Sequence, residues 1–580
     1  MIEAPTDPAA PAPACPGPWA RDYDHPVPWD RAFTPMALPD MLAHTARRYP
    51  DQIFLHFLGR RFSYGAIAAK VEAAAEGFRR LGVQRGVKVG LFLPNCPHYV
   101  IAYYAIMRAG GTVVNFSPLY TADELAHQVD DAGVETMVCL DLEQLFPAIA
   151  EVQARGTLKR LIVGNLAEVL PPLKALAYRM FRSADRAKVG YGRSRLRFAD
   201  LFTHGPITAA PEIDVHQDIA LIQYTGGTTG RPKGALLSHA NLSINAAQVH
   251  AMDDTPTAHD RILGALPLFH VFANTCVLNR TILAADEIVL MPKFELEDVV
   301  RIIPAMKITT LPGVPSMYRA LLEHPDIAHV DLTSLRICIS GGAPMPKELR
   351  DAFVAQTGAK LVEGYGLTES SGVASVNPYD TGGKIGSIGQ PMPGTCIVIC
   401  DQEDPTRILP DGEKGEITLQ GPQMMRGYYN RPDADDETFV EGRLRTGDVG
   451  YIDEDGYVFI VDRMKDLILV GGFNVYPSAL EEVLYAHEAV KEAIVIGIDD
   501  RRLGQRPKAF VTLQEGAHVS EADLLGYLNA RVGKHERAAA VEIRAELPKT
   551  MIGKLSRKEL VEKEKARAAT AEVVAHAKEG

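Results

Sequence analysis

The chain has 580 residues, of which 46% are hydrophobic and 23% are charged, and these values are typical of globular proteins with room for two or more domains. Its formal net charge of −12 at pH 7 argues against broad nucleic-acid binding, which needs basic surface to neutralise phosphates. The seven cysteines are scattered without a CxxC pair, which argues against a zinc ribbon or a disulfide framework and favours a reducing cytoplasm.

The first 33 residues are rich in proline and alanine, and they predict a flexible tail. They lack the basic and apolar regions of a signal peptide. No run of ~18 apolar residues follows that would predict a membrane-spanning helix, so a cytoplasmic protein is expected.

Apolar runs at 87–94, 136–140 and 158–164 come next and alternate with helical patterns at 64–81 and 122–131. Alternation of this kind predicts parallel sheets that are covered by helices.

The segment 171–198 carries eight lysines and arginines and one acid, inside an acidic chain. Five apolar residues can share one face of a short helix there, namely Leu173, Leu176, Ala177, Met180 and Phe181. A basic amphipathic helix binds anionic membrane surfaces, whereas a solvated surface excursion is the alternative interpretation. Peripheral contact with an anionic membrane is therefore left open.

Residues 224–234 read YTGGTTGRPKG. Glycine lets backbone N–H groups turn toward an anion, threonine adds hydroxyl donors, and Lys233 adds a charge. The loop is not a Walker A motif, because Lys233 follows a proline and precedes a glycine. Its flanks resemble strands, and Ser238 or Asn241 is expected to begin the next helix, so the pattern predicts a strand-to-strand turn over a phosphate. A flexible turn with a surface lysine is the alternative.

The sequence pattern changes beyond about residue 382, where glycine- and proline-containing turn signals become frequent. Dense turn signals predict a small β-rich subdomain, and a mixed segment with helices at 477–487 and 521–532 is expected after Asp462. The domain boundary is placed near 462–465.

The loop at 224–234 resembles the phosphate loop of the adenylate-forming superfamily, which includes acyl-CoA synthetases, peptide-synthetase adenylation domains and firefly luciferase. Six further stretches follow in the family's order and spacing: PLFH (267–270), SGGAPMP (340–346), EGYGLTES (363–370), RTGDVG (445–450), VDRMKDLILVGGFNVYP (461–477) and LPKTMIGK (547–554). The resemblance covers about 38–560 and is closest to bacterial long-chain fatty acyl-CoA synthetases.

The resemblance implies an α/β fold. A large N-terminal domain of two helix-covered sheets plus a small β-barrel subdomain is expected over 34–461. A small mobile α+β C-terminal domain, which carries the catalytic lysine, is expected over 462–580.

The resemblance also implies a two-step reaction. A carboxylate attacks the α-phosphate of ATP to give an acyl-adenylate and pyrophosphate, and the thiol of coenzyme A then expels AMP. ATP, Mg²⁺ and coenzyme A are the implied cofactors and co-substrates. Two other classes compete, namely a non-catalytic AMP/ATP-binding regulator and a peptide-synthetase module, although no carrier-like domain follows Lys554. A homodimer is left open.

The site residues that the resemblance implies form four groups. ATP binding is assigned to Thr225, Gly226, Gly227, Thr228, Thr229, Gly230, Lys233, Gly341, Gly342, Ala343, Glu363, Gly364, Tyr365, Asp448 and Arg463. Catalysis is assigned to Lys554, which bridges the carboxylate and the α-phosphate, to Thr368 at the α-phosphate, to Glu369 as the Mg²⁺ ligand, and to His270 beside the substrate carboxylate. The hinge is assigned to Lys465, and the coenzyme A side to Gly471 and Gly472.

The expected carboxylate is a medium- to long-chain fatty acid. The segments 241–252 and 269–283, which should line the acyl tunnel, are rich in small residues that leave volume for a chain. A dicarboxylic or aryl acid is the alternative substrate. The chain departs from the resembled branch at 533–543, where a Tyr-Lys-x-Pro pattern is often found. The difference falls on the local surface of the C-terminal domain and on part of the expected entrance for coenzyme A.

Overall fold

The computed structural model describes residues 17–225, 232–253, 259–471, 473–500, 502–549 and 555–567. Two compact units are present. Unit 1 holds the described residues up to Ile397 together with Leu419–Leu444 and Asp455–Tyr457. Unit 2 holds Val398–Thr418, Arg445–Glu454 and the described residues from Val458 onward. The predicted domain limits at 34–461 and 462–580 stay a prediction.

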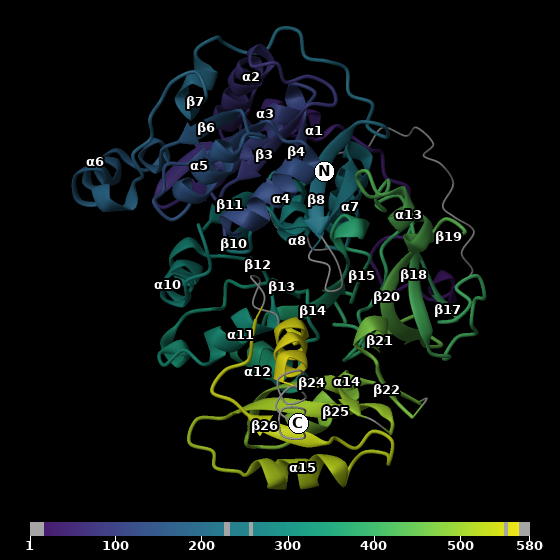
Figure 1. Ribbon diagram of the computed structural model, residues 1–580. Helices are drawn as coiled ribbons and strands as arrows, with labels where there is room; N and C mark the ends of the chain where they lie inside the picture. Colours follow the sequence, from purple (N-terminus) through teal and green to yellow (C-terminus); the bar gives the residue numbers. More distant parts are fainter. Residues whose placement is uncertain are drawn as a thin grey trace, which may run out of the picture. The chain divides into compact units, whose positions relative to one another are not determined.

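The first sheet of unit 1 has seven strands in the order β7-β6-β5-β3-β4-β8-β9, all parallel except the antiparallel pair β8–β9 (Figure 1). Its strands are β3 (Lys88–Phe92), β4 (Thr112–Phe116), β5 (Thr136–Leu140), β6 (Arg160–Gly164), β7 (Arg195–Arg197), β8 (Ile219–Thr225) and β9 (Lys233–Ser238). The accompanying helices are α2 (Tyr64–Arg80), α3 (Pro97–Arg108), α4 (Ala122–Ala132), α5 (Phe146–Arg155) and α6 (Pro172–Phe181). The predicted parallel, helix-covered sheet is confirmed.

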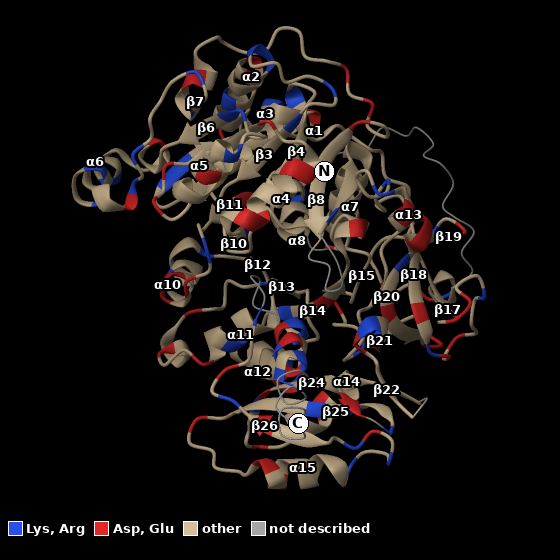
Figure 2. Cartoon of the chain, in the orientation of Figure 1, with Lys and Arg blue, Asp and Glu red and all other residues tan. Residues whose placement is uncertain are grey.

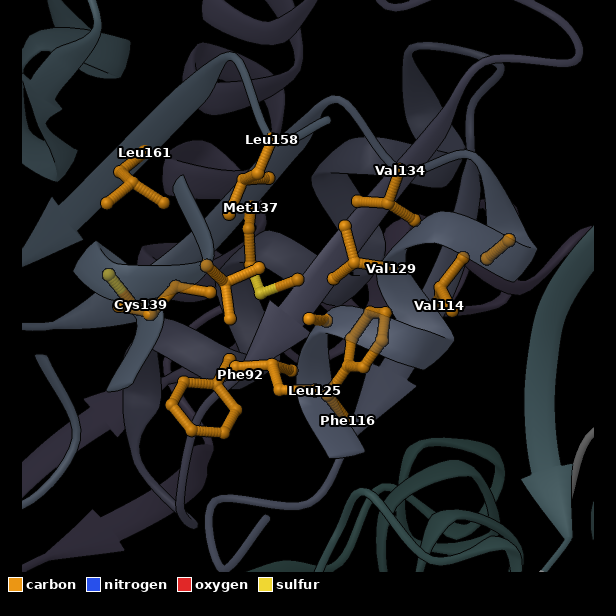
Figure 3. Close-up of a cluster of buried hydrophobic side chains, with 14 of the residues drawn as sticks. Phe92, Val114, Phe116, Leu125, Val129, Val134, Met137, Cys139, Leu158 and Leu161 are labelled. Carbon is orange, nitrogen blue, oxygen red and sulfur yellow. The ribbon is translucent and has the colours of Figure 1, made fainter. Parts of the chain in front are cut away.

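The core of this sheet explains why its strands are apolar on both faces. Every residue of β4 and β5 is buried, as expected for a parallel sheet that is covered on both sides. Figure 3 shows Phe92, Phe116 and Met137 packing with Val129 of α4 in one cluster. Each buried side chain of this size contributes about 1.5–3 kcal/mol to stability.

The second sheet of unit 1 has nine strands in the order β16-β15-β14-β13-β12-β10-β11-β1-β2. Its strands are β1 (Ile53–Phe57), β2 (Arg60–Ser63), β10 (Arg261–Gly264), β11 (Glu287–Leu290), β12 (Thr310–Gly313), β13 (Ile337–Ser340), β14 (Lys360–Tyr365), β15 (Ser375–Val376) and β16 (Gln390–Pro391). The accompanying helices are α1 (Leu38–Arg48), α7 (His239–Ala251), α8 (Val271–Ala273), the π-helix η5 (Asn274–Asn279), α9 (Arg280–Ala284), α10 (Leu296–Met306), α11 (Pro315–Leu322) and α12 (Lys347–Thr357). Strands β10 to β14 are parallel, so their carboxyl ends lie at one edge.

The expected β-rich segment after residue 382 forms a five-stranded sheet, β17-β18-β20-β19 with β21 beside β20. Its elements are β17 (Cys396–Cys400), β18 (Gly415–Gln420), α13 (Pro432–Thr438), β19 (Phe439–Val440), β20 (Arg443–Ile452) and β21 (Val458–Arg463).

A last sheet lies in unit 2, in the order β23-β22-β25-β24 with β26 parallel to β25. Its elements are β22 (Ile468–Val470), β23 (Phe473–Val475), α14 (Pro477–Tyr485), β24 (Val490–Asp500), β25 (Gly504–Leu513), α15 (Glu521–Asn529) and β26 (Ala540–Ile543). Leu480 of α14 and Leu524 of α15 pack with Val495 in its core. The α+β character expected here is confirmed. Within the described residues, no helix is both long and apolar enough to cross a bilayer.

Residues 17–33 differ from the loose tail that their composition predicts. Trp19 is fully buried, and Trp29 Nε1 donates to Thr395 O at 2.8 Å. Gly456, at φ +80°, lies so close that a Cβ there would be 2.6 Å from Trp19 N. Composition misled because two large aromatic side chains, each packed on distant residues of unit 1, fix a segment that is otherwise rich in proline.

Candidate active site

The predicted phosphate turn is formed by the hairpin β8–β9. Thr225 ends β8 and pairs with Lys233 at the start of β9, which confirms the strand-to-strand connection. The helix α7 begins as expected at Ser238, whose Oγ accepts from Asn241 N at 3.2 Å. The residues of the turn itself lie outside the described residues, namely Gly226, Gly227, Thr228, Thr229 and Gly230.

Tyr428 joins the lysine of this hairpin to the predicted magnesium ligand. Its hydroxyl donates to Glu369 Oε1 at 2.6 Å, and Lys233 Nζ lies 5.0 Å from the centroid of its ring. Burial, and then the nearby Glu369, raise the pKa of Tyr428, so its hydroxyl stays a donor. The arrangement places a cation, a hydroxyl donor and a carboxylate in one cluster.

Backbone pairing places Tyr428 at this point. Arg426 N donates to Leu236 O at 2.9 Å, and Tyr429 N donates to Gly234 O at 2.8 Å, so the segment lies along β9. Glu369 itself is anchored from the same segment, because its carbonyl accepts from Met425 N at 2.7 Å. The sequence interpretation missed Tyr428; its one local signal is the aromatic pair in RGYYN.

The predicted adenine-binding residues follow two adjacent parallel strands. Ser340 at the end of β13 pairs with Glu363 of β14, so Gly341–Ala343 lies beside Glu363–Tyr365. Gly342 has φ +83°, a backbone conformation that residues with a side chain rarely adopt. Glu363 Oε1 accepts from Met345 N at 2.8 Å and holds this loop. Burial raises the pKa of Glu363 to about 7.

His270 lies at the start of α8, where its Nδ1 accepts from Phe272 N at 3.3 Å. The helix continues into the π-helix η5, an irregularity that is frequent at functional sites. Thr275 Oγ1 donates to Ser371 O at 2.6 Å and so joins this turn to the short helix η7 (Thr368–Ser370), which carries Glu369. Small or polar side chains of the predicted acyl segment are buried here, including Ala246, Ala273, Asn274 and Thr275.

Unit 2 brings together the two residues predicted to hold the ribose. Asp448 of β20 and Arg463 of β21 are paired across the strands, and Arg463 Nε lies 2.9 Å from Asp448 Oδ1. The Asp448 side chain is only 3% exposed, which fixes its orientation. The other described residues of the predicted nucleotide site belong to unit 1.

The predicted hinge lies beside a dense set of charges in unit 2. Lys465 is part of the short helix η8 (Met464–Asp466). Arg557 binds Glu481 through contacts of 2.6 and 2.7 Å, and its Nη1 lies 3.4 Å from Asp466 Oδ2. Arg557 therefore ties the chain just after position 554 to the hinge and to α14.

Two residues assigned to this unit, Lys554 and Gly472, lie outside the described residues. Gly471 has φ +58°, and its N donates to Leu503 O at 2.7 Å.

A family model described as AMP-binding enzyme matches residues 42–429, and a second, described as AMP-binding enzyme C-terminal domain, matches 479–554. The long-chain-fatty-acid–CoA ligase of Bacillus subtilis strain 168 is 38% identical over 556 residues, which cover 94% of this chain and 98% of the relative.

Two solved structures are similar over nearly their whole length. ATP-bound MatB from Rhodopseudomonas palustris is 29% identical with a TM-score of 0.79, and the match covers 90% of this chain and 98% of that one. O-succinylbenzoate coenzyme A synthetase from Bacillus subtilis, in complex with ATP and a magnesium ion, is 26% identical with a TM-score of 0.72; the match covers 89% of this chain and 98% of that one. The first family match includes Lys233, Glu369 and Tyr428, and the second ends at Lys554.

Proposed function

The chain belongs to the AMP-binding enzyme family, and from this premise we propose how its residues divide the reaction. The chain is an ATP-dependent ligase that joins a fatty acid to coenzyme A through an acyl-adenylate. In the first step a carboxylate oxygen bonds to the α-phosphorus and pyrophosphate leaves. In the second step the thiol sulfur bonds to the acyl carbon and AMP leaves.

The observation that carries the proposal for the site is the cluster of Lys233, Tyr428 and Glu369. We propose that Lys233 supplies positive charge to the β- and γ-phosphates. Tyr428 positions both neighbours, because its ring lies under the ammonium and its hydroxyl fixes one oxygen of Glu369. Charge held in place before the reaction stabilises a phosphoryl group in transfer without reorganisation during the step.

The donor set of this cluster fits Mg²⁺ better than a resident transition metal. No group of three or more His, Cys, Asp or Glu side chains suited to a metal occurs among the described residues. Mg²⁺ is commonly held by one or two carboxylates plus substrate phosphates, and Glu369 provides such a carboxylate. Bound magnesium would neutralise charge on the phosphates. The chain's own part is to hold Glu369 in one orientation through Tyr428.

The remaining roles are proposed from the family's motifs. The backbone at Gly341–Ala343 and the ring of Tyr365 take the adenine. Asp448 and Arg463 take the ribose. Thr368 contacts the α-phosphate, and His270 lies by the carboxylate of the acid. Lys554 bridges the two reacting groups and then leaves as unit 2 turns about Lys465, which brings Gly471 and Gly472 to the coenzyme A side.

We further propose that the preferred acid has a medium to long chain. The small buried side chains of α7 and of the turn after His270 support this proposal. Each added CH₂ should strengthen binding by ~0.8 kcal/mol until the tunnel is filled.

The test is pyrophosphate release, with and without coenzyme A, over fatty, dicarboxylic and aryl acids. A rise in kcat/KM from short to long fatty acids is expected, and a preference for benzoate or for a dicarboxylic acid would overturn the chain-length proposal. Pyrophosphate release that never depends on coenzyme A would contradict the second step.

A cytoplasmic location with peripheral contact to anionic lipid is also proposed, on the strength of the basic segment 171–198.

A further inference from the structure

Helix α6 presents its apolar residues to solvent. It has no buried residue, and its Leu173 and Phe181 are the two most exposed large hydrophobic side chains of the described chain, at 83% and 78%. Leu176 and Met180 complete the face, since positions i, i+3, i+7 and i+8 lie on one side of a helix. Figure 1 shows α6 standing apart at the left edge of unit 1.

The opposite side of α6 attaches it to unit 1. Ala175 and Tyr178 are half-buried on that side. Lys174 Nζ donates to Leu58 O at 2.9 Å, in the turn between β1 and β2. The helix is therefore held through Ala175, Tyr178 and Lys174 while its apolar face points outward, the reverse of a helix that stabilises a core.

Basic side chains border this face. Figure 2 shows lysine and arginine on α6 and on the adjoining segment of the same chain. The side chain of Arg179 has no hydrogen bond or ion pair with any residue that the structure describes. Arg182 pairs with Asp185 at 2.5 Å, and Asp185 is the sole acid of 171–198. The border keeps a net positive charge.

An open groove of about 740 Å³ lies at the base of α6, between it and the β1–β2 hairpin. Arg60, Arg61, Arg179 and His56 line it together with one acid, Glu168. Arg60 Nη1 donates to Glu168 O at 2.7 Å, which fixes this guanidinium at the groove wall.

The carboxylate in the groove has a partner of its own. Glu168 Oε2 lies 3.4 Å from His98 Nε2. The positive charge of the groove wall also affects His56. Burial lowers the pKa of His56, and Glu287 opposes this shift. Arg61 and Lys174 lower the pKa further. Three guanidinium groups in an open groove are suited to a phosphodiester.

We propose that α6 and this groove form a docking surface for an anionic phospholipid bilayer, an inference that rests on the peripheral lipid contact proposed above and assigns it to these residues. Leu173, Leu176, Met180 and Phe181 enter the boundary between headgroups and acyl chains, while the groove arginines bind headgroup phosphate oxygens. The two features are complementary, because an apolar helix face and an arginine-lined groove side by side match the two layers of a membrane surface. A fatty acid dissolved in that membrane would then lie close to the enzyme that consumes it.

The test is co-sedimentation of the full-length protein with vesicles of phosphatidylcholine, with or without phosphatidylglycerol, at low and high salt. We expect binding to the anionic vesicles, which weakens as salt rises. Leu176→Gln combined with Phe181→Gln should weaken it by at least about tenfold, and Arg179→Gln by about fivefold. Matched controls are Ile408→Gln, at 53% exposure against 56% for Leu176, and Arg301→Gln on α10.

Several results would overturn the proposal. One is absence of binding at low salt, and another is equal binding by the variants and the controls. Glycerol phosphate binding that equals vesicle binding and ignores the apolar variants would assign the groove to a soluble phosphate. Self-association lost in Leu176→Gln/Phe181→Gln would assign the face to a second copy. Ligase activity on soluble acids should not change in any variant, so failure here is separate from failure of the ligase assignment.

Discussion

Two carboxylates, one in each unit, differ in how many of their oxygens are already used. Among the described residues, the Glu369 side chain of unit 1 has one hydrogen-bond partner, the Tyr428 hydroxyl at 2.6 Å. Glu481 of unit 2 binds Arg557 with both oxygens and also accepts from Val495 N at 2.7 Å. A carboxylate with remaining capacity can bind metal and substrate, whereas a saturated one holds segments of the chain together. The number of oxygens in use therefore distinguishes Glu369, which is suited to a chemical role, from Glu481, which holds the fold, without reference to any motif.

The largest expected effect concerns Lys554, the proposed catalytic lysine, which precedes Arg557 by three residues in the chain. Lys554→Ala should slow adenylation by about 10³-fold, because a charge that spans both reacting groups is lost. It should spare thioester formation from supplied acyl-adenylate. Pyrophosphate exchange measures the first half, and a single turnover of synthetic acyl-AMP with coenzyme A measures the second.

Lys465→Pro is the matched variant for the hinge. Proline fixes φ near −65° and should therefore hold the hinge in one arrangement. If that is the adenylating arrangement, the variant should form acyl-adenylate but fail to form the thioester. Equal loss of both halves in Lys554→Ala, or two intact halves in Lys465→Pro, would contradict the two-conformation mechanism.

The next effect tests the comparison directly. Glu369→Gln keeps an acceptor for Tyr428 but removes the charge, so adenylation should fall by about 10²-fold with stability unchanged within about 0.5 kcal/mol. Glu481→Gln should do the opposite: it weakens the hydrogen-bonded ion pair with Arg557 and costs about 2 kcal/mol of unfolding free energy. Pyrophosphate exchange and urea unfolding are measured on both. If Glu481→Gln lost activity while its stability stayed unchanged, the assignment of a chemical role to Glu369 and a structural role to Glu481 would be wrong.

A smaller effect is expected for Tyr428→Phe. The ring stays beneath Lys233, and only the hydrogen bond to Glu369 is lost. Hydrogen bonds to charged groups contribute about 1.5–3 kcal/mol, so adenylation should fall by about tenfold or more. A titration with Mg²⁺ should show a weaker apparent affinity. An unchanged Mg²⁺ dependence would mean that Tyr428 positions Lys233 alone.

The last expected effect is on stability and depends on pH. Burial raises the pKa of Glu363 from 4.5 to about 7, so the folded protein keeps this proton at pH values where the unfolded chain has released it. Stability should therefore fall as pH rises from about 4.5 to 7, and this fall should be absent in Glu363→Gln. Melting temperatures across that range, with the exposed Glu348→Gln as control, measure it. Parallel curves for all three proteins would refute the shift.

Local patterns predicted the elements well because their causes are local. The apolar run at 136–140 coincides with β5, and the predicted start of α7 at Ser238 follows from its own capping box. The helix predicted at 521–532 ends earlier, at Asn529. Periodicity also placed the apolar residues of α6 on one face.

The failures have non-local causes. Tyr428 meets Glu369 across 59 residues of chain, and no short window contains both. The burial of Trp19 depends on Gly456, far along the sequence, so composition gave no sign of it. The motifs identified the charged residues of the site, while the neutral group that positions them depends on tertiary pairing.

The ordered N-terminal segment has a spectroscopic consequence. The chain contains two tryptophans, and both of them, Trp19 and Trp29, lie in residues 17–33. Intrinsic indole fluorescence therefore reports on this segment and not directly on the nucleotide site, the hinge or α6. Because Trp19 is fully buried, its emission is expected at short wavelength, and a red shift under mild denaturant would mark detachment of the segment before the sheets unfold. A melting curve read from tryptophan emission alone would then describe about seventeen residues, and circular dichroism is needed to follow the rest.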